Sequence, residues 1–589
     1  MATKIRKNFA ACLLCCNIVA GTMALTSCND FLTIYPTDRI VGDDFWKTKS
    51  DVDQMVDGCY QAMLDYNVME RTIVWGGYRS DELVKFTDVI DNTLDNIAAV
   101  NLLPTNRYTS WGDFYKVINF CNIVLNHAED VMAEDPEFTM GDYQVVRAQM
   151  LALRSLCYFY LVRTFRDIPY SDKAFEDDTQ VEPMPQLAPD VVLQNCLNDL
   201  EESRRYIMRS GAFGENDWRN KGYITRDAVH AIMADIYLWR AAMTHSTADY
   251  QQAIAFCDSV INAKHAYYEQ HKTVTVTSEK EEDIYHLYRG TQALSSIFGE
   301  GGNSRESILE WQYNGRPNSN TALENYYYER GNDDKHETTS TFMASLLFNS
   351  VDKTGKKVYM SDNDYRFWNN VFDANNMEAD QLSVRKMVYN GSGYFEGEQG
   401  EQRGKSTSRA FREFQQNWIV YRLTDVMLMK AEALVETAAN DSDQVALRNA
   451  FDLVQVVNKR SMKETATDTL KYDDYKSKSA LERLVLDERE RELCFEGKRW
   501  WDLMRYYYRH MEGVNISVPM ADQGTWPALY KPMLELIVRK YADGGGDAVS
   551  YKMKSEPYLY WPVQESEMKV NALLKQNPVY IQEKSTSKN

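Results

Sequence analysis

The chain has 589 residues, with 66 Lys and Arg against 86 Asp and Glu, and a formal net charge of −20. Apolar residues make up 44% of it, so it can bury a large core and is not disordered along its whole length. This acidic balance argues against the basic surface that nucleic-acid-binding proteins use. Aromatic residues make up 12%, including 38 Tyr, and are candidates both for the core and for a ligand surface.

The N-terminus has the composition of a secretory signal. A basic head at residues 4–7 precedes an interrupted apolar stretch at residues 9–25, which is too short and too broken for a transmembrane helix. It ends in Leu25-Thr26-Ser27-Cys28, which resembles a bacterial lipobox. We therefore expect residues 1–27 to be removed and Cys28 to be lipidated. The alternative is an ordinary cleaved signal followed by a chance cysteine.

The remaining cysteines lie in apolar, helix-like contexts without paired spacing. They are Cys59, Cys121, Cys157, Cys196, Cys257 and Cys494. We expect buried free thiols rather than three disulfides, although an exported protein could form them. No Cys or His cluster has ligand spacing, so the sequence predicts no metal site and no cofactor. A structural Ca²⁺ in the Asp- and Asn-rich loops stays open, but no loop has EF-hand spacing.

Residues 45–265 show a 3.6-residue hydrophobic period and predict a helical scaffold. One helix includes residues 151–161, a second begins after the N-cap candidate Thr225, and a third includes residues 250–261. Ala and Tyr at the packing positions of such pairs indicate degenerate tetratricopeptide-like repeats. An ordinary helical bundle is the alternative interpretation.

Residues 266–417 are rich in Gly, Asn, Ser, Tyr and Asp, and predict a loop-rich insert with a short strand at 307–313. The helical period returns at Ile419 and lasts to about residue 510, and residues 511–589 are again loop-rich. No linker separates independent domains. We therefore predict one mainly α domain over 28–589, in which scaffold segments 45–265 and 418–510 pack together and a few short strands occur.

Residues 484–505 form a charged helix that leads into Gly497 and two tryptophans. The segment resembles the signature of the SusD/RagB family of outer-membrane nutrient-binding lipoproteins. The matching positions are Glu488, Arg489, Glu492, Leu493, Phe495, Glu496, Gly497, Arg499, Trp500, Asp502, Leu503 and Arg505. Residues 147–170, 422–433 and 559–580 resemble three further segments of the family, so the resemblance spans nearly the whole mature chain. Arg166 departs from it, because a Gly is usual there.

The resemblance implies a SusD-like fold and a non-catalytic lipoprotein anchored to the outer membrane and exposed at the cell surface. It implies capture of an oligosaccharide, or more rarely a peptide, and delivery to a SusC-like TonB-dependent transporter. No later segment reaches about 18 uninterrupted apolar residues, so we expect the lipid to be the sole membrane contact, and the acidic balance predicts no nucleic-acid partner. The charges of residues 488–505 alternate in sign and can neutralise one another, so no catalytic residue is expected there. The alternatives are a peptide- or protein-binding member of the family, or a secreted helical glycoside hydrolase.

Sugar binding needs flat aromatic faces beside hydrogen-bonding side chains. Segments 73–86, 325–330 and 364–368 combine the two. The candidate ligand-binding residues are Trp75, Tyr78, Arg79, Asp81, Tyr326, Tyr327, Tyr328 and Trp368. The alternative for each is a structural role, with the ring in the core and the charge fixing a loop. Trp111 and Tyr115 lie on a helical stripe, where we expect core packing.

Overall fold

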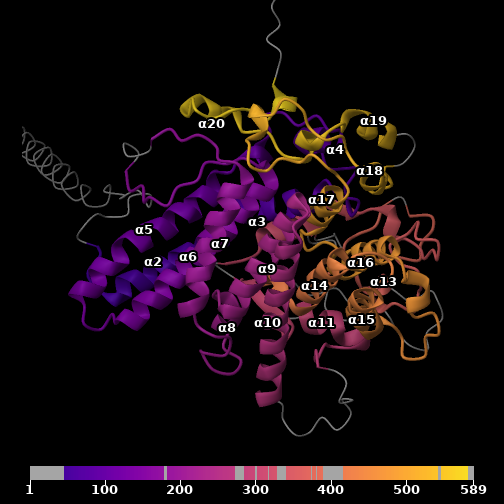
Figure 1. Cartoon of the computed structure of the whole chain (residues 1–589), viewed down its shortest axis with the longest axis horizontal. Coiled ribbons are helices and arrows are strands. Elements are labelled where there is room, and N and C mark those ends of the chain that lie inside the picture. Colours follow the sequence, from indigo (N-terminus) through magenta and orange to yellow (C-terminus); the bar gives the residue numbers. More distant parts are fainter. Residues whose placement is uncertain are drawn as a thin grey trace, which may run out of the picture.

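The structure is a computed structural model, and it describes residues 45–177, 182–271, 284–298, 302–315, 318–327, 340–372, 374–379, 381–388, 415–541 and 545–581. Within them the protein is mainly helical with two short two-stranded sheets, as the sequence predicts (Figure 1). The lipobox, Cys28 and Tyr328 lie outside the described residues.

The helices fall into three groups along the chain. Those before the insert are α2 (Lys49–Met63), α3 (Tyr66–Ile73), η1 (Val74–Tyr78), α4 (Asn92–Ala98), η2 (Arg107–Thr109), α5 (Gly112–Glu134), α6 (Met140–Phe165), α7 (Pro189–Tyr206), α8 (Arg219–Gly222), α9 (Arg226–Thr244) and α10 (Thr247–His271). Those of the insert are η4 (Gly290–Gln292), α11 (Ala293–Phe298), α12 (Thr321–Tyr327), η5 (Leu346–Phe348) and α13 (Tyr365–Asn369). Those after it are α14 (Leu423–Thr437), α15 (Gln444–Ser461), η6 (Tyr472–Tyr475), α16 (Lys478–Leu493), α17 (Arg499–Arg509), η7 (Met520–Asp522), α18 (Lys531–Val538), α19 (Gly545–Lys552), η8 (Glu556–Leu559), α20 (Glu565–Val570) and η9 (Pro578–Tyr580).

Helices that follow one another along the chain pack side by side. α5 packs on α6, α6 on α7, α7 on α9 and α9 on α10. After the insert the chain returns as α14, which packs on α10 and then on α15 and α16 (Figure 1). The segments on either side of the insert therefore share one hydrophobic core.

Helix α6 lies in the middle of this core. Thr139 caps its first turn, and its hydroxyl and the Asp142 carboxylate form a reciprocal capping box. The helix is long and apolar enough to cross a membrane, but 89% of its most apolar window is buried inside the protein. Its composition is therefore that of a central core helix, and Trp111 packs nearby as predicted, with 3% of its surface exposed.

Two antiparallel strand pairs join the insert to the scaffold. β1 (Leu83–Lys85) pairs with β3 (Phe342–Ala344), and β2 (Ser307–Trp311) pairs with β4 (Trp418–Arg422). The strand predicted within 307–313 is confirmed, but the prediction of a helix from Ile419 is wrong for its first turn. The first four of the five residues of β4 are aromatic or β-branched, and the strand hydrogen-bonds to β2, so the helix begins only at Leu423.

The charges of residues 488–505 form a buried network, as the sequence predicts. Arg491 and Glu488 make an i,i+3 pair at 2.9 Å, but most partners come from distant elements. Glu492 Oε2 lies 3.0 Å from Arg366 Nη1, its Oε1 lies 2.5 Å from Arg422 Nη1, and Arg460 also contacts Oε1. Burial opposes ionisation of Glu492, but the three guanidinium groups outweigh it and hold its pKa well below the usual range.

Arg166 shows what replaces the glycine that is usual in the family. It follows α6 with φ +68°, in the left-handed region that glycine adopts most easily. Its guanidinium is fully buried and lies 2.9 Å from Asp167 Oδ1 and 3.2 Å from Glu556 Oε1. The turn therefore keeps the left-handed conformation, with buried ion pairs that a glycine could not make.

The six cysteines are all buried and free, as predicted. Burial raises the pKa of the Cys157 thiol well above its usual range, so it stays protonated. These thiols therefore behave as small core side chains and not as redox centres.

Candidate functional site

The first predicted ligand segment lies in the core, so its predicted exposure is wrong. Trp75 has no exposed surface, its indole Nε1 donates to the Tyr108 carbonyl at 2.8 Å, and its ring stacks on Phe114 at 5.2 Å. Tyr78 is 2% exposed and stacks on Phe342 at 4.6 Å between centroids. A ring covered on both faces offers no surface to a sugar.

The charged residues of that segment have structural partners. The Arg79 guanidinium donates to the Leu559 carbonyl at 2.8 Å and lies 4.4 Å over the Trp500 ring. Asp81 is fully buried and pairs with Arg499 at 2.9 Å and Arg539 at 2.7 Å. Burial opposes ionisation of Asp81, but the two guanidinium groups outweigh it and lower its pKa.

The other predicted rings are also buried. Tyr326 donates to Glu70 Oε1 at 2.7 Å, and Tyr327 donates to the Phe495 carbonyl at 3.1 Å. The Trp368 indole donates to the Asp362 carbonyl at 2.8 Å, and only 3% of the residue is exposed. Tyr326 and Tyr327 join the insert to the scaffold, and Trp368 binds within the insert. The prediction that these three rings are exposed to a ligand is wrong, because all three are buried.

The structure instead opens a cleft between α2, α8 and β2. Its volume is about 570 Å³, which lies within the range of about 300–1,000 Å³ typical of small-ligand sites. We call it the Trp218 cleft. Its lining residues are Asp57, Tyr60, Gln61, Leu64, Trp218, Gly222, Tyr223, Asn303, Trp311, Gln312, Tyr313, Asn314, Asn318, Gln415 and Asn417.

One wall of the cleft is aromatic. Trp218 begins α8 and is 48% exposed, with its ring 5.6 Å from that of Tyr223 at an interplanar angle of 67°. The Tyr223 ring packs against the Tyr60 ring at 4.8 Å between centroids, and its hydroxyl donates a hydrogen bond to Asp57. Burial raises the pKa of the Tyr223 hydroxyl, which therefore stays protonated and keeps this hydrogen bond. The wall holds Trp218 at a fixed angle and leaves part of its ring accessible.

Amide side chains form the part of the lining next to this aromatic wall, since Gln312 and the Trp218 ring both border Gly222. Asn303 and Gln312 exchange two hydrogen bonds of 2.9 Å, and Asn417 Nδ2 donates to Gln312 Oε1 at 3.1 Å. Gly302 makes this arrangement fit, because it has φ +54° and a Cβ there would lie 2.4 Å from Asn417 Nδ2. Asn417 is buried and bonds to Tyr313, Glu310 and Gln312, so it positions Gln312, while the partly exposed Asn303 and Gln312 present donors and acceptors to the cleft.

The chemistry of the cleft favours binding over catalysis. Asp57 is the one carboxylate among its described lining residues, and it already accepts the Tyr223 hydroxyl. Glycoside hydrolysis normally uses two carboxyl groups on either side of the scissile bond. An aromatic face beside amide side chains can bind a neutral polyol, whose C–H groups contact the ring while its hydroxyls meet the amides.

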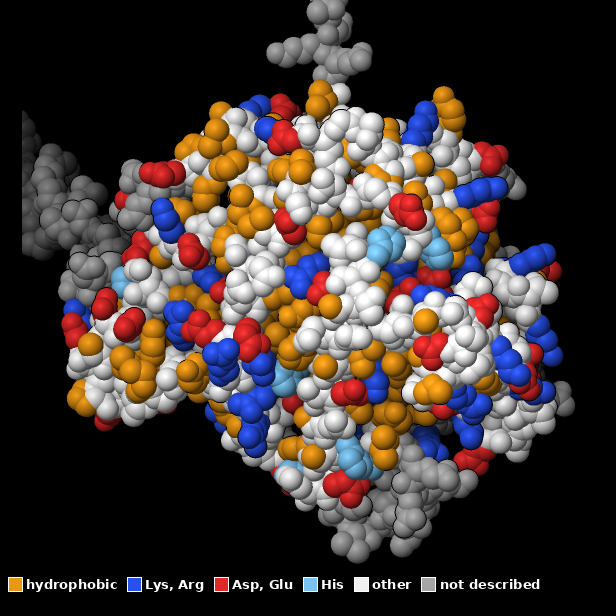
Figure 2. Space-filling view, in the orientation of Figure 1, with side chains coloured by type: hydrophobic (Ala, Val, Ile, Leu, Met, Phe, Trp, Pro, Cys, Tyr) orange, Lys and Arg blue, Asp and Glu red, His pale blue; other side chains and the backbone are white. Residues whose placement is uncertain are grey.

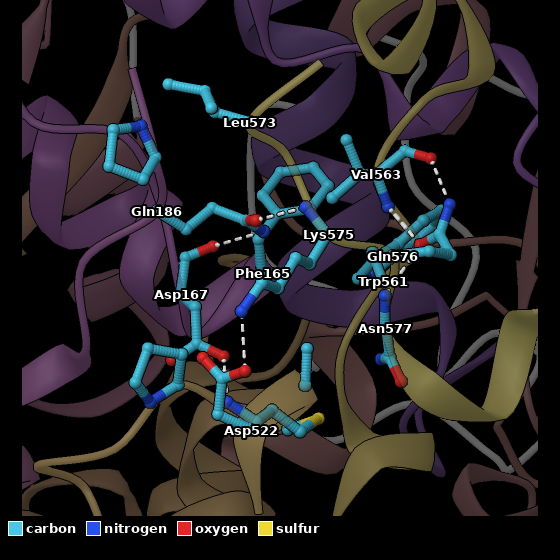
Figure 3. A pocket seen from close by; sticks show the side chains of 14 residues that line it. Phe165, Asp167, Gln186, Asp522, Trp561, Val563, Leu573, Lys575, Gln576 and Asn577 are labelled. Atoms are coloured by element: carbon cyan, nitrogen blue, oxygen red, sulfur yellow. Dashed lines mark hydrogen bonds and ion pairs between the residues drawn. The ribbon is translucent and has the colours of Figure 1, made fainter. Parts of the chain in front are cut away.

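A second pocket lies where the C-terminal segment crosses the end of α6 (Figure 3). It measures about 110 Å³, well below the usual volume of a ligand site. Lys575 Nζ pairs with Asp522, and the Lys575 amide donates to Gln186 Oε1 at 2.8 Å. Burial raises the pKa of Asp167 in this pocket to about 6. Its polar groups bind one another across the junction, so we assign it a structural role.

The visible face of Figure 2 mixes acidic and basic side chains over most of its area. The net charge of −20 is therefore not gathered into one patch on this face.

Sequence reasoning missed Trp218, although the signal was present. Trp218 stands in Asn216-Asp217-Trp218-Arg219-Asn220, an aromatic residue among polar neighbours in a turn-rich stretch. Residues 312–314 repeat the pattern at the end of β2. The same pattern selected segment 73–86, so it finds candidates but does not separate exposed rings from buried ones.

Two family models match the chain. The model described as "SusD family" matches residues 240–580, and the model described as "Starch-binding associating with outer membrane" matches residues 30–238. Among curated proteins, SusD-like protein P38 of Formosa agariphila is 23% identical, over 88% of this chain and 96% of its own length. SusD-like protein P2 of the same organism is also 23% identical, over 82% and 88%.

Solved structures of low sequence identity share the fold. A SusD superfamily protein from Bacteroides thetaiotaomicron aligns with a TM-score of 0.61 at 19% identity, covering 91% of this chain and 99% of that one. A SusD superfamily protein from Bacteroides fragilis aligns with a TM-score of 0.62 at 18% identity, covering 91% and 100%. The arrangement of helices and strands described above is therefore that of this superfamily.

Proposed function

Because the chain belongs to the SusD family, whose members are non-catalytic binding proteins, we propose that it captures an oligosaccharide in the Trp218 cleft at the cell surface. The observation that carries the proposal is the half-exposed Trp218 residue beside the partly exposed amides of Gln312 and Asn303 in one cleft. The name of the N-terminal family model, which refers to starch binding at the outer membrane, supports a glycan ligand.

The cleft suits a neutral glycan. The apolar face of a pyranose ring stacks on Trp218, and its equatorial hydroxyls exchange hydrogen bonds with the amide wall. Asp57 is the one charged side chain among the described lining residues and accepts the Tyr223 hydroxyl, so the rest of the lining offers uncharged groups to a ligand. A volume of about 570 Å³ accommodates a short oligosaccharide segment and leaves the rest of the chain outside.

Calorimetry of the purified protein against a panel of neutral oligosaccharides and peptides tests this function. We expect saturable binding of at least one oligosaccharide and a loss of affinity of about 3- to 10-fold in Trp218→Ala, which removes one stacking contact. Tyr551→Ala is the matched control, since Tyr551 is 74% exposed on α19 and lies outside the cleft lining. Binding of peptides alone would contradict the proposal and favour the peptide-binding alternative.

The proposal includes lipid attachment at Cys28 and delivery of the glycan to a SusC-like TonB-dependent transporter. The Leu-Thr-Ser-Cys ending of the signal segment and the family membership support both steps. Cys28→Ser should abolish incorporation of labelled fatty acid and release the protein from the outer membrane. Copurification of the unmodified protein with a TonB-dependent transporter tests the partnership, and its absence after mild solubilisation would count against delivery.

A further inference from the structure

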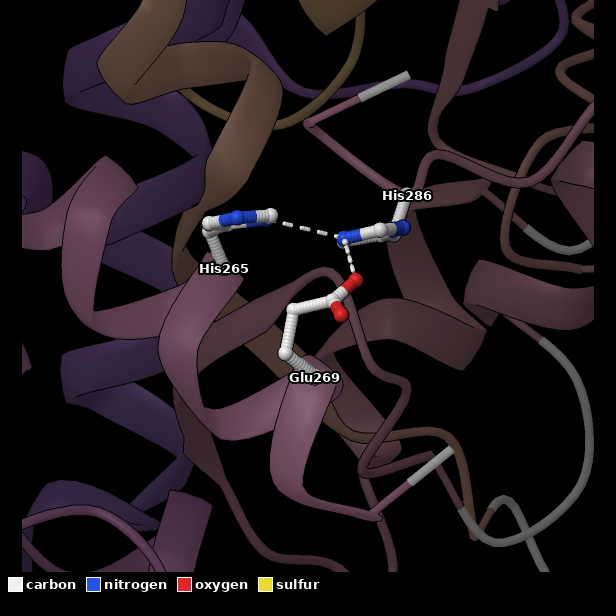
Figure 4. A group of neighbouring side chains, drawn as sticks. All are labelled: His265, Glu269 and His286. Atoms are coloured by element: carbon white, nitrogen blue, oxygen red, sulfur yellow. Dashed lines mark hydrogen bonds and ion pairs between the residues drawn. The ribbon is translucent and has the colours of Figure 1, made fainter. Parts of the chain in front are cut away.

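Three potential ligand side chains converge beside the far half of α10 (Figure 4). His265 and Glu269 are four residues apart on this helix and so lie on one face. His286 reaches them from a separate part of the insert. His265 Nδ1 lies 3.0 Å from His286 Nε2, which lies 3.4 Å from Glu269 Oε1, and the three ligand atoms are all within 4.8 Å of one another.

We propose that His265, Glu269 and His286 bind a divalent transition-metal ion, with Zn²⁺ the best match. Two imidazoles and one carboxylate are borderline ligands that suit Zn²⁺ far better than Ca²⁺ or Mg²⁺. Metal–ligand bonds of about 2.0–2.1 Å in a tetrahedron place neighbouring ligand atoms about 3.3 Å apart. The two separations of 3.0 and 3.4 Å lie close to that spacing.

Neighbouring residues hold His286, the ligand farthest from the other two in the sequence, in place. His286 has φ +49°, a left-handed conformation that is uncommon outside glycine and often marks a functional position. Tyr268 stacks on its ring at 3.8 Å between centroids and an interplanar angle of 18°. His286 is 9% exposed, so its ring has little freedom to turn away. The side chain of Glu269 is 38% exposed, which leaves a route for the ion and for a water as fourth ligand.

The ion would act as a clip. His265 and His286 are 21 residues apart, so shared coordination closes a loop of that length and limits the freedom of the unfolded chain. Beyond His286, the Tyr288 amide donates to Glu306 Oε1 at 2.8 Å, at the start of β2. The clip therefore fastens α10 to the segment that enters the β2–β4 sheet. This role is independent of glycan binding in the Trp218 cleft.

Zinc titration of the chelator-treated protein tests the proposal. We expect one equivalent of Zn²⁺ to bind, Co²⁺ to give the visible absorption of a four-coordinate site, and Zn²⁺ to raise the Tm. Glu269→Gln keeps the size of an exposed side chain, so it should leave the metal-free Tm unchanged and weaken Zn²⁺ binding by about 10-fold or more. His286→Ala should weaken it at least as much.

His271→Ala is the matched control, since His271 lies on the same helix but outside the cluster. It should bind Zn²⁺ as tightly as the unmodified protein. The proposal is overturned if the unmodified protein binds no stoichiometric Zn²⁺, or if Glu269→Gln and His286→Ala bind it equally well. The cluster would then be a hydrogen-bonded group of the two imidazoles and the carboxylate.

Discussion

The 488–505 segment and the Trp218 cleft use polar side chains in opposite ways. In the segment, the carboxylates and guanidinium groups are almost completely buried. Each of them has partners of opposite sign, such as the three arginines around Glu492. In the cleft, amides align one another beside a tryptophan that is 48% exposed. Saturated charges hold the fold together, whereas half-exposed neutral groups remain available to a ligand.

This contrast explains why the most distinctive motif of the sequence is not a site. Burying a charge is costly unless its partners and hydrogen bonds are complete, so a buried network tolerates little change. A cleft for a neutral ligand needs a ring face and a few oriented amides, which many short segments can supply. The segment that resembles the family motif therefore belongs to the scaffold of this protein. The candidate ligand surface is identified instead by the exposure of its side chains.

The largest expected effect comes from breaking the buried network. Glu492→Ala leaves Arg366, Arg422 and Arg460 without a shared carboxylate, and we expect it to reduce the free energy of unfolding by about 3–5 kcal/mol. Urea denaturation followed by circular dichroism measures this. Arg448→Ala is the control, because the Arg448–Asp452 pair is about half exposed and should contribute about 0.5 kcal/mol or less. Equal effects of the two changes would remove the contrast between buried and exposed charge.

A slightly smaller loss of stability is expected for Trp75→Ala, and it distinguishes Trp75 from Trp218. Trp75→Ala empties a fully buried position and should cost about 3–4 kcal/mol of unfolding free energy. Trp218→Ala should change stability by about 0.5 kcal/mol or less, since half of the residue is already in solvent. Thermal and urea unfolding of both variants decide the matter. A stable Trp75→Ala protein with lost glycan affinity would return segment 73–86 to the ligand surface.

Acid should weaken the buried network next. Burial opposes ionisation of Asp425 and Glu432, but Lys498 and Arg489 around the first, and Arg505 and Arg509 around the second, lower both pKa values to about 2. Unfolded carboxyls titrate near pH 4, so the unfolded chain binds these protons first as the pH falls. Each carboxylate thus contributes stability above about pH 4.5 that is lost toward pH 2, about 2–3 kcal/mol at full effect.

Urea midpoints between pH 5 and pH 2.5 measure that loss. Asp167 acts oppositely, because burial raises its pKa to about 6 and its contribution falls as the pH rises through that value. Below pH 4 its contribution no longer changes, so the decline there comes from the carboxylates with lowered pKa values, which include Asp425 and Glu432 along with Asp81 and Glu492. Glu432→Gln cannot ionise at this position and should show a shallower decline. A midpoint that stays constant down to pH 2.5 would contradict the role assigned to the network.

The helices were largely predictable, because α10 buries a stripe at 3.6-residue spacing, and α6 and α9 are long apolar segments buried on almost every side. The exposure of single rings was not, because it depends on contacts far along the chain. The Trp75 indole donates a hydrogen bond to the Tyr108 carbonyl, and its ring is covered by Phe114. The residues next to Trp75 in the sequence do not predict either contact. The strand at Ile419 was read as helix for the same reason, since its partner β2 lies more than 100 residues earlier.

The smallest expected effect concerns the shape of the cleft. A Cβ on Gly222 would lie 2.6 Å from Gln312 Cγ and 2.7 Å from Trp218 Cε3. Gly222→Ala must therefore displace both the Gln312 side chain and the Trp218 ring. Both side chains border open space and can move, so the stability change should stay below about 1 kcal/mol. Because the ring and the amide then lose their alignment, glycan affinity should fall about 2- to 5-fold by calorimetry.

Gly58→Ala is the matched change, because Gly58 lies within helix α2 and has nothing within 4 Å of the added Cβ. It should leave glycan affinity unchanged and stabilise the protein by about 0.4–1 kcal/mol, since alanine loses less backbone freedom on folding. If Gly222→Ala bound glycan as tightly as Gly58→Ala, the alignment of Trp218 with Gln312 would not matter for binding. The ligand surface would then have to be sought beyond the Trp218 cleft.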